Sequence, residues 1–135
     1  MMSQQLPKEV RIREVGPRDG FQNEPDVIPT AEKVRLLGLL SDSGLRRIEV
    51  TSFVRPDVIP QLADGAEVLS RYEPRDGVAY SVLIPNRRGL DLALKQRDRF
   101  QEANFFLSAS ETHNRKNVNR SIAESLADLE GTIAA

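Results

Sequence analysis

The sequence has no cysteine and only one histidine, His113. The absence of cysteine excludes disulfides and thiolate metal sites and is typical of an intracellular chain, so we expect a soluble cytoplasmic protein. No long apolar run is present, and neither a transmembrane helix nor a signal peptide is therefore expected. Because 19 basic residues balance 20 acidic ones, no charge excess favours nucleic acid or an anionic membrane as partner.

The 135 residues, 39% of them hydrophobic, suffice for one ordinary domain. We expect a polar tail over residues 1–9 and one domain over 10–135. Strand and helix patterns alternate, with Thr30 expected to cap the first helix. Strands are predicted over 10–15, 48–50, 78–84 and 103–107, and helices over 30–43, 61–72, 86–94 and 122–133. This order is typical of parallel β-then-α units.

Four such units fit either a small open α/β sheet or part of a barrel. A flavodoxin-like sheet usually has a fifth strand, and a complete (β/α)8 barrel needs about 250 residues. The last helical pattern runs to Ala135 without a C-cap, which favours the second fold. The predicted fold class is therefore α/β, the N-terminal half of a TIM barrel with about four strands and four helices.

Arg18, Asp19 and Gly20 follow the first predicted strand and form the main candidate site. A fixed cation beside a carboxylate suits a hard metal ion and an enolate oxygen, since Asp is an oxygen ligand and Arg a fork-shaped donor. The same triplet is more often a simple turn. A second copy, at residues 75–77, precedes a strand and is interpreted as such a turn. Only its position after a strand favours a functional site for the first copy.

Glu49 lies between two β-branched residues of the second predicted strand. Alternation directs its carboxylate into the interior, where an unpaired charge would be costly. We therefore expect it to pair with an arginine of the first unit. The pair is either purely structural or a device that holds the guanidinium of Arg18 in place.

His113 belongs to a polar segment after the fourth strand, where a histidine is more often exposed to solvent than a ligand. No second histidine exists to form a His-x-His pair. Asp19 is one firm oxygen ligand, and one ligand cannot make a metal site without partners.

Three segments resemble the hydroxymethylglutaryl-CoA lyase family. Residues 14–24, EVGPRDGFQNE, are similar to its first-strand signature, and residues 48–56 with 60–64 to its second unit. Residues 108–111 with 116–119 resemble the fourth unit. Related isopropylmalate and homocitrate synthases share Arg-Asp-Gly, but Gly16-Pro17 before it and residues 21–24 after it are similar to the lyase branch.

The resemblance implies a metal-dependent barrel that cleaves a 3-hydroxy-3-methylglutaryl thioester of CoA to acetyl-CoA and acetoacetate, a reaction of leucine degradation. By the resemblance, Asp19 is a ligand of Mg²⁺ or Mn²⁺. Arg18 stabilises the enolate, and Glu49 orients Arg18 and supports proton transfer. Substrate contacts are implied for Gln22, Ser52 and Glu111.

The family's remaining metal ligands, a His-x-His pair and an Asn, come from later strands, as does its glycine-rich loop with a catalytic cysteine. None of these is in the sequence, so we expect the first half of such an enzyme, inactive in isolation. Two alternatives stay open. One is a non-catalytic half-barrel that self-associates through exposed sheet edges. The other is a small α/β ligand-binding domain, which would lack a glycine-rich phosphate loop.

Overall fold

The computed structural model of this chain describes residues 6–134. Its centre is a parallel sheet in the order β1-β2-β3. The strands are β1 (Arg47–Ser52), β2 (Ala79–Leu83) and β3 (Glu102–Asn104). Residues 1–5, the first part of the tail expected over 1–9, and residue 135 lie outside the described part.

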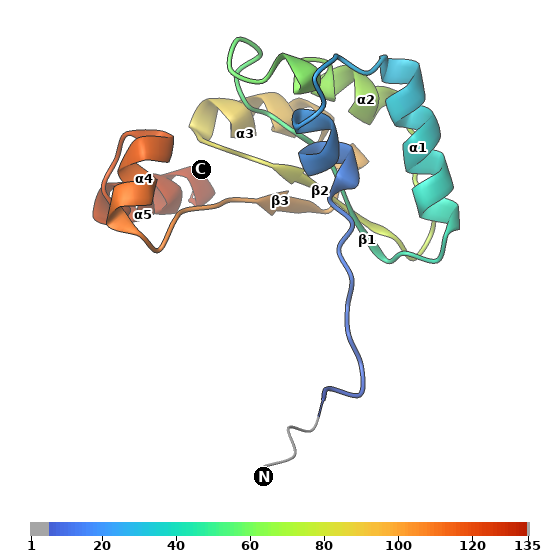
Figure 1. The fold of residues 1–135 in the computed structure, drawn as a ribbon, viewed down its shortest axis with the longest axis horizontal. Coiled ribbons are helices and arrows are strands. Elements are labelled where there is room, and N and C mark those ends of the chain that lie inside the picture. Colours follow the sequence, from blue (N-terminus) through green and yellow to red (C-terminus); the bar gives the residue numbers. More distant parts are fainter. Residues whose placement is uncertain (1–5, 135) are drawn as a thin grey trace.

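One helix precedes each strand, as β/α units require. These are α1 (Thr30–Asp42), α2 (Gly65–Arg71) and α3 (Arg87–Ala93). Figure 1 shows the three helices along the same side of the sheet. Two further helices, α4 (Glu111–Val118) and α5 (Ile122–Ile133), follow β3, and three short helical turns complete the described elements: η1 (Gly16–Gly20), η2 (Pro60–Leu62) and η3 (Leu94–Arg99). The α/β class with parallel units is thus confirmed.

The core lies between the sheet and α1–α3. Its fully buried members include Ile48 and Val50 of β1, with Tyr80 and Val82 of β2. Leu37 of α1, Val68 and Leu69 of α2, and Tyr72, which directly follows α2, pack against them. Because side chains alternate along a strand, the residues between these apolar ones, including Glu49, face away from the helices. The opposite face of the sheet therefore carries polar groups.

Gly65, the first residue of α2, brings that helix close to the end of β1. A Cβ at this position would lie 2.7 Å from Thr51 Oγ1 and 3.2 Å from the carbonyl oxygen of Ser52. Any larger residue would push the helix from the strand. Because Gly65 has no side chain, α2 can pack directly against the carboxyl end of β1.

The first predicted strand is reduced to a single parallel bridge between Glu14 and Ile48. Glu14 N donates to Arg47 O (2.9 Å), and Glu49 N donates to Glu14 O (2.8 Å). Upstream, Val10 and Ile12 are exposed, so their alternating pattern buries no face. Alternation predicts a strand only where a neighbouring strand covers one side of it. Within the described residues the sheet therefore has three strands.

Other boundaries shift for local reasons. The predicted helix 61–72 is divided into η2 and α2, and the strand predicted over 103–107 ends at Asn104. Thr30 is the first residue of α1 and does not cap it. Helix α4 was not predicted, because its sequence is almost entirely polar and buries only Asn114. The helix is held by hydrogen bonds of this side chain and not by an apolar face. Its Oδ1 accepts from Ser108 N, and its Nδ2 donates to Arg120 O, Ser121 O and Ser125 Oγ.

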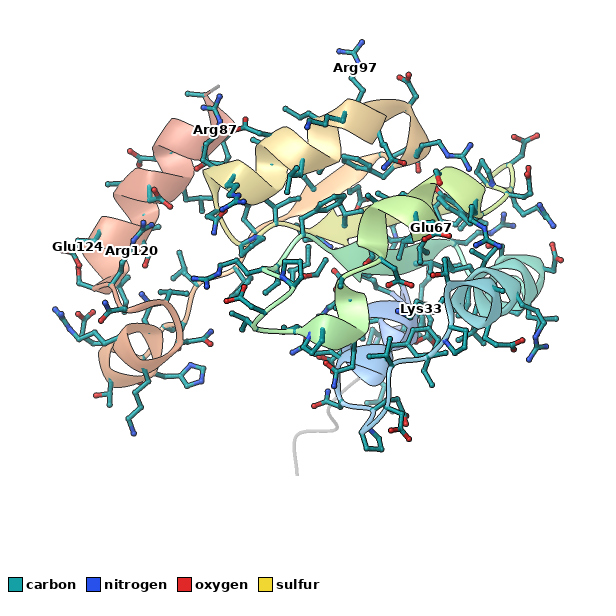
Figure 2. All side chains as sticks on the ribbon, turned by 90° about the horizontal axis from the view of Figure 1, so that it is seen from above. Lys33, Glu67, Arg87, Arg97, Arg120 and Glu124 are labelled. Atoms are coloured by element: carbon teal, nitrogen blue, oxygen red, sulfur yellow. The ribbon has the colours of Figure 1, made fainter. Side chains whose placement is uncertain are left out.

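The capping box predicted for α5 is present. Ser121 Oγ accepts from Glu124 N (3.1 Å), and Ser121 N donates to Glu124 Oε2 (2.7 Å). Figure 2 shows Glu124 at the start of this helix beside Arg120. The Ser121 backbone donor lowers the pKa of Glu124 below its ordinary value of 4.5.

A lowered carboxylate pKa stabilises the fold above the ordinary pKa, and this contribution is lost as pH falls through the lowered value. We therefore expect the first turn of α5 to fray below pH 4.5, the ordinary pKa of Glu124. Amide hydrogen exchange of residues 122–126, followed by NMR against pH, measures this. Exchange rates are compared as protection factors, relative to the intrinsic rate of each amide at the same pH. Glu124→Gln is the control and should remove the pH dependence of this protection. Equal exchange profiles in both proteins would contradict the role of the cap.

Candidate functional site

The segment after the Glu14 bridge turns sharply into η1. Gly16 N donates to the carboxylate of Glu14 (2.6 Å), and Asp19 N donates to Val15 O (2.7 Å). The first Arg-Asp-Gly triplet is therefore part of a helical turn. In the second copy, Gly77 has a φ of +77°, as a turn glycine does. The two copies of the triplet thus have different backbone structures.

Arg18 is held between two carboxylates. Its Nε donates to Glu49 Oε1 (2.6 Å) and its Nη1 to Asp19 Oδ1 (2.7 Å). Glu49 is nearly inaccessible, with 4% of its side chain exposed, whereas 52% of the Asp19 side chain is exposed. Within residues 6–134 the Nη2 group of Arg18 has no hydrogen-bond partner. The expected pairing of Glu49 with Arg18 is thus present, and Nη2 remains for a ligand.

Asn104, at the end of β3, is a member of this cluster that the sequence analysis missed. Its Nδ2 donates to Glu49 Oε2 (2.5 Å). The available signal was the same as for Glu49, a polar residue interrupting the apolar run of a strand. The hydrogen bonds of Glu49 thus link η1, β1 and β3.

A cavity of about 410 Å³ lies beside Arg18 and Gln22. Leu83, Pro85 and Phe106 line it from the ends of β2 and β3, and Asn117 and Val118 from α4. Val54, Val58 and Ile59 complete the lining. Its size falls within the range of about 300–1,000 Å³ typical of ligand sites. The lining is mostly apolar, with an arginine and two amides as polar groups, an arrangement suited to a small polar group on an apolar ligand.

The other residues expected to contact substrate lie elsewhere. Ser52 is buried, and its hydroxyl accepts from Val54 N (3.1 Å). Glu111 accepts from Ile122 N (3.0 Å) and pairs with Arg115, so it joins α4 to α5. His113 is exposed, with Nδ1 3.0 Å from Ser108 Oγ. None of these three lines the cavity beside Arg18.

Asp19 is the residue in this cluster best placed to hold a divalent metal, because its carboxylate is exposed and provides hard oxygen donors. Among residues 6–134, no group of three or more His, Cys, Asp or Glu side chains could hold such an ion. The described part therefore offers one metal ligand and not a complete set.

A helix that crosses a membrane must have sufficient length and apolar character. Among residues 6–134, no helix has both.

Comparison with known proteins shows which family of sequences and structures this chain resembles. The HMGL-like family model matches residues 9–135. The hydroxymethylglutaryl-CoA lyase YngG of Bacillus subtilis is 52% identical over 124 residues, which cover 92% of this chain and 41% of the relative. A solved HMG-CoA lyase from the same species superimposes with a TM-score of 0.89 at 50% identity, over 95% of this chain and 42% of that chain.

A second solved structure, an Acinetobacter baumannii HMG-CoA lyase in complex with coenzyme A and 3-methylmalate, has a TM-score of 0.85 at 40% identity. The superposition includes 92% of this chain and 40% of the Acinetobacter chain. The chain therefore spans about two-fifths of the length of the relatives it matches. The resemblance found in the sequence and the predicted fold class are both confirmed.

Proposed function

The chain belongs to the HMGL-like family, and we propose that it is the first part of a hydroxymethylglutaryl-CoA lyase. The observation that carries this proposal is Arg18, whose guanidinium is held by buried Glu49 and whose side chain lines the cavity of about 410 Å³. The 52% identity to a lyase over this region supports it.

In the proposed reaction a base removes the proton of the 3-hydroxyl, and the bond between C2 and C3 of the acyl group breaks. The oxygen becomes the ketone of acetoacetate, and C2 leaves as the enolate of acetyl-CoA, which then takes up a proton. The free Nη2 of Arg18 donates to the thioester oxygen as its negative charge grows. Glu49 keeps the guanidinium aligned with this oxygen and supports proton transfer.

Asp19 is the residue of this chain that would hold the metal, Mg²⁺ or Mn²⁺. A divalent ion held there would supply positive charge that stabilises the developing enolate. Asp19 fits this role because its carboxylate is exposed beside Arg18 and not buried in the core. Within residues 6–134, its carboxylate contacts one side chain, that of the adjacent Arg18.

The cavity beside Gln22 suits the acyl end of the substrate. Its volume of about 410 Å³ accommodates a branched six-carbon acyl group, whereas the CoA moiety would extend out of it. The side-chain amide of Gln22 can hydrogen-bond to a carboxylate or hydroxyl of that group. Roles for Ser52 and Glu111 would be indirect, through the backbone that they hold.

We expect the isolated chain to bind Mg²⁺ or Mn²⁺ weakly and to release no measurable acetoacetate. Hard cations need about six oxygen ligands, and the described part offers one clear candidate. Calorimetric titration and an acetoacetate assay of the 135-residue chain test this expectation. Tight binding, or turnover by the chain alone, would overturn it.

The function itself is tested with a chimera in which residues 1–135 replace the matching part of the Bacillus subtilis enzyme. The 52% identity over this region makes such a replacement feasible. Metal-dependent release of acetoacetate from 3-hydroxy-3-methylglutaryl-CoA is the expected result. The Bacillus remainder alone serves as the control. A folded chimera without turnover would refute the proposal.

Three expectations from the sequence stay predictions. They are a cytoplasmic location, the division of the chain into a tail over residues 1–9 and a domain over 10–135, and self-association through exposed sheet edges.

A further inference from the structure

We propose that Asn104 is a positioning residue for Arg18, acting through Glu49. The proposal rests on the lyase function proposed above and adds a residue to its machinery. Asn104 does not line the cavity beside Arg18, so its effect must pass through the carboxylate that it holds.

The geometry of Glu49 carries this inference. Arg18 Nε binds Oε1 at 2.6 Å, and Asn104 Nδ2 binds Oε2 at 2.5 Å. A carboxylate held at one oxygen can rotate about its terminal bond, whereas one held at both has a fixed plane. The guanidinium is planar, so fixing the plane of its partner fixes its own direction.

Burial makes the second contact necessary. Only 4% of the Glu49 side chain is exposed, so water is a poor substitute for a lost donor at Oε2. If Asn104 is removed, Oε2 is left unsatisfied, and rotation toward another donor becomes favourable. The contact at Oε1 to Arg18 then loses its alignment.

The register of the sheet sets how far this contact must reach. Glu49 pairs with Ser81 of β2, whereas Asn104 of β3 pairs with Leu83, two residues further along the same strand. Two strand spacings amount to about 9.5 Å, and the offset of two residues adds about 6.6 Å along the strands, so the two side chains meet across β2 on a diagonal. Only two long side chains that extend toward one another, such as Glu and Asn, can close this distance.

The contact is tested first by NMR on the chain of residues 1–135, through the exchange of the Arg18 Nε proton with solvent. Asn104→Asp has the same shape but replaces the donor with a second carboxylate, and we expect exchange at least about tenfold faster. Asn104→Gln retains a donor and should recover most of the protection. Asn23→Ala is the control, because Asn23 contacts the backbone of Asp19 and not Glu49.

The effect on catalysis is tested in the Bacillus chimera. Asn104→Asp should lower kcat about 10- to 100-fold, because small misplacements of a catalytic group have effects of this size. KM should stay within about twofold, since the ground-state contacts of the substrate do not involve Asn104. Asn104→Gln should restore most of kcat, which a role in packing alone would not predict.

The outcomes separate the two proposals. A folded parent chimera without turnover refutes the lyase function, and the NMR exchange then decides the Asn104 contact by itself. If the parent is active and Asn104→Asp keeps both its kcat and its slow exchange, the inference about Asn104 fails alone. Faster exchange with an unchanged kcat also overturns it, because the contact would then be structural only.

Discussion

Asp19→Asn should lower acetoacetate release by the chimera about a thousandfold, while its melting temperature stays the same. A metal held by Asp19 would contribute several kcal/mol of charge stabilisation, and about 4 kcal/mol corresponds to a thousandfold in rate. Asn keeps the shape of Asp but carries no charge to hold the ion. Because half of the Asp19 side chain is exposed and its side-chain partner is the neighbouring Arg18, its loss costs little stability.

The second Arg-Asp-Gly copy provides a matched control. Asp76 is exposed, precedes β2 and lies in a turn with Gly77 at positive φ. Asp76→Asn makes the same chemical change and should leave turnover unaltered. The measurement is turnover at saturating Mn²⁺ beside a thermal melt for both variants. Parent-like turnover in Asp19→Asn would refute the metal-ligand role, and a much lower melting temperature would favour a turn with a structural role only.

Local context in the sequence was sufficient to separate the two triplets. The copy at 18–20 follows a bridge to β1, and the copy at 75–77 leads into β2. Alternation around Glu49 was likewise sufficient, because a carboxylate between Ile48 and Val50 must leave the apolar face of β1 and find a cation. Rules that depend on neighbours in the chain therefore predicted the pairing of Glu49 with Arg18 at the centre of the candidate site.

Features that depend on distant partners were not predictable in this way. The run over 10–15 alternates as a strand does, but only Glu14 finds a neighbour in β1. The contact of Asn104 with Glu49 joins residues on β3 and β1, across β2. No local pattern contains the register that brings them together. Helix α4 depends on hydrogen bonds of buried Asn114 and not on apolar periodicity, so the wall that it gives the cavity was also missed.

Asp64→Ala should lower the free energy of unfolding by about 3–5 kcal/mol, because it leaves a buried cation without its partner. Lys33 of α1 is 3% exposed, and its Nζ donates to Asp64 Oδ1 and to Gln61 O, each at 2.6 Å. Thr30 Oγ1 donates to the other oxygen of Asp64 (2.7 Å), and the N-cap position of α1 belongs to Pro29. Figure 2 shows Lys33 directed from α1 toward the neighbouring elements.

Urea denaturation of the 135-residue chain measures this loss. Glu67→Ala is the matched control, since Glu67 pairs with Arg71 at 2.8 Å on the exposed side of α2, with side chains 56% and 47% exposed (Figure 2). That change should cost about 0.5 kcal/mol or less. A domain of this size has about 5–15 kcal/mol of stability in total, so the loss at Asp64 would take a large share of it.

The double variant Lys33→Met, Asp64→Leu identifies the cause of the loss. Replacing both charges with apolar groups of similar volume is often neutral, so most of the stability should return. If the double variant is as unstable as Asp64→Ala, the stranded charge is not the cause, and packing around α2 is. Lys33 Nζ also lies 5.9 Å from the ring centroid of Phe21, the residue that directly follows η1. The same buried cation therefore contacts the end of the helical turn that contains Arg18 and Asp19. We expect Asp64→Ala to increase the mobility of this turn before the sheet unfolds.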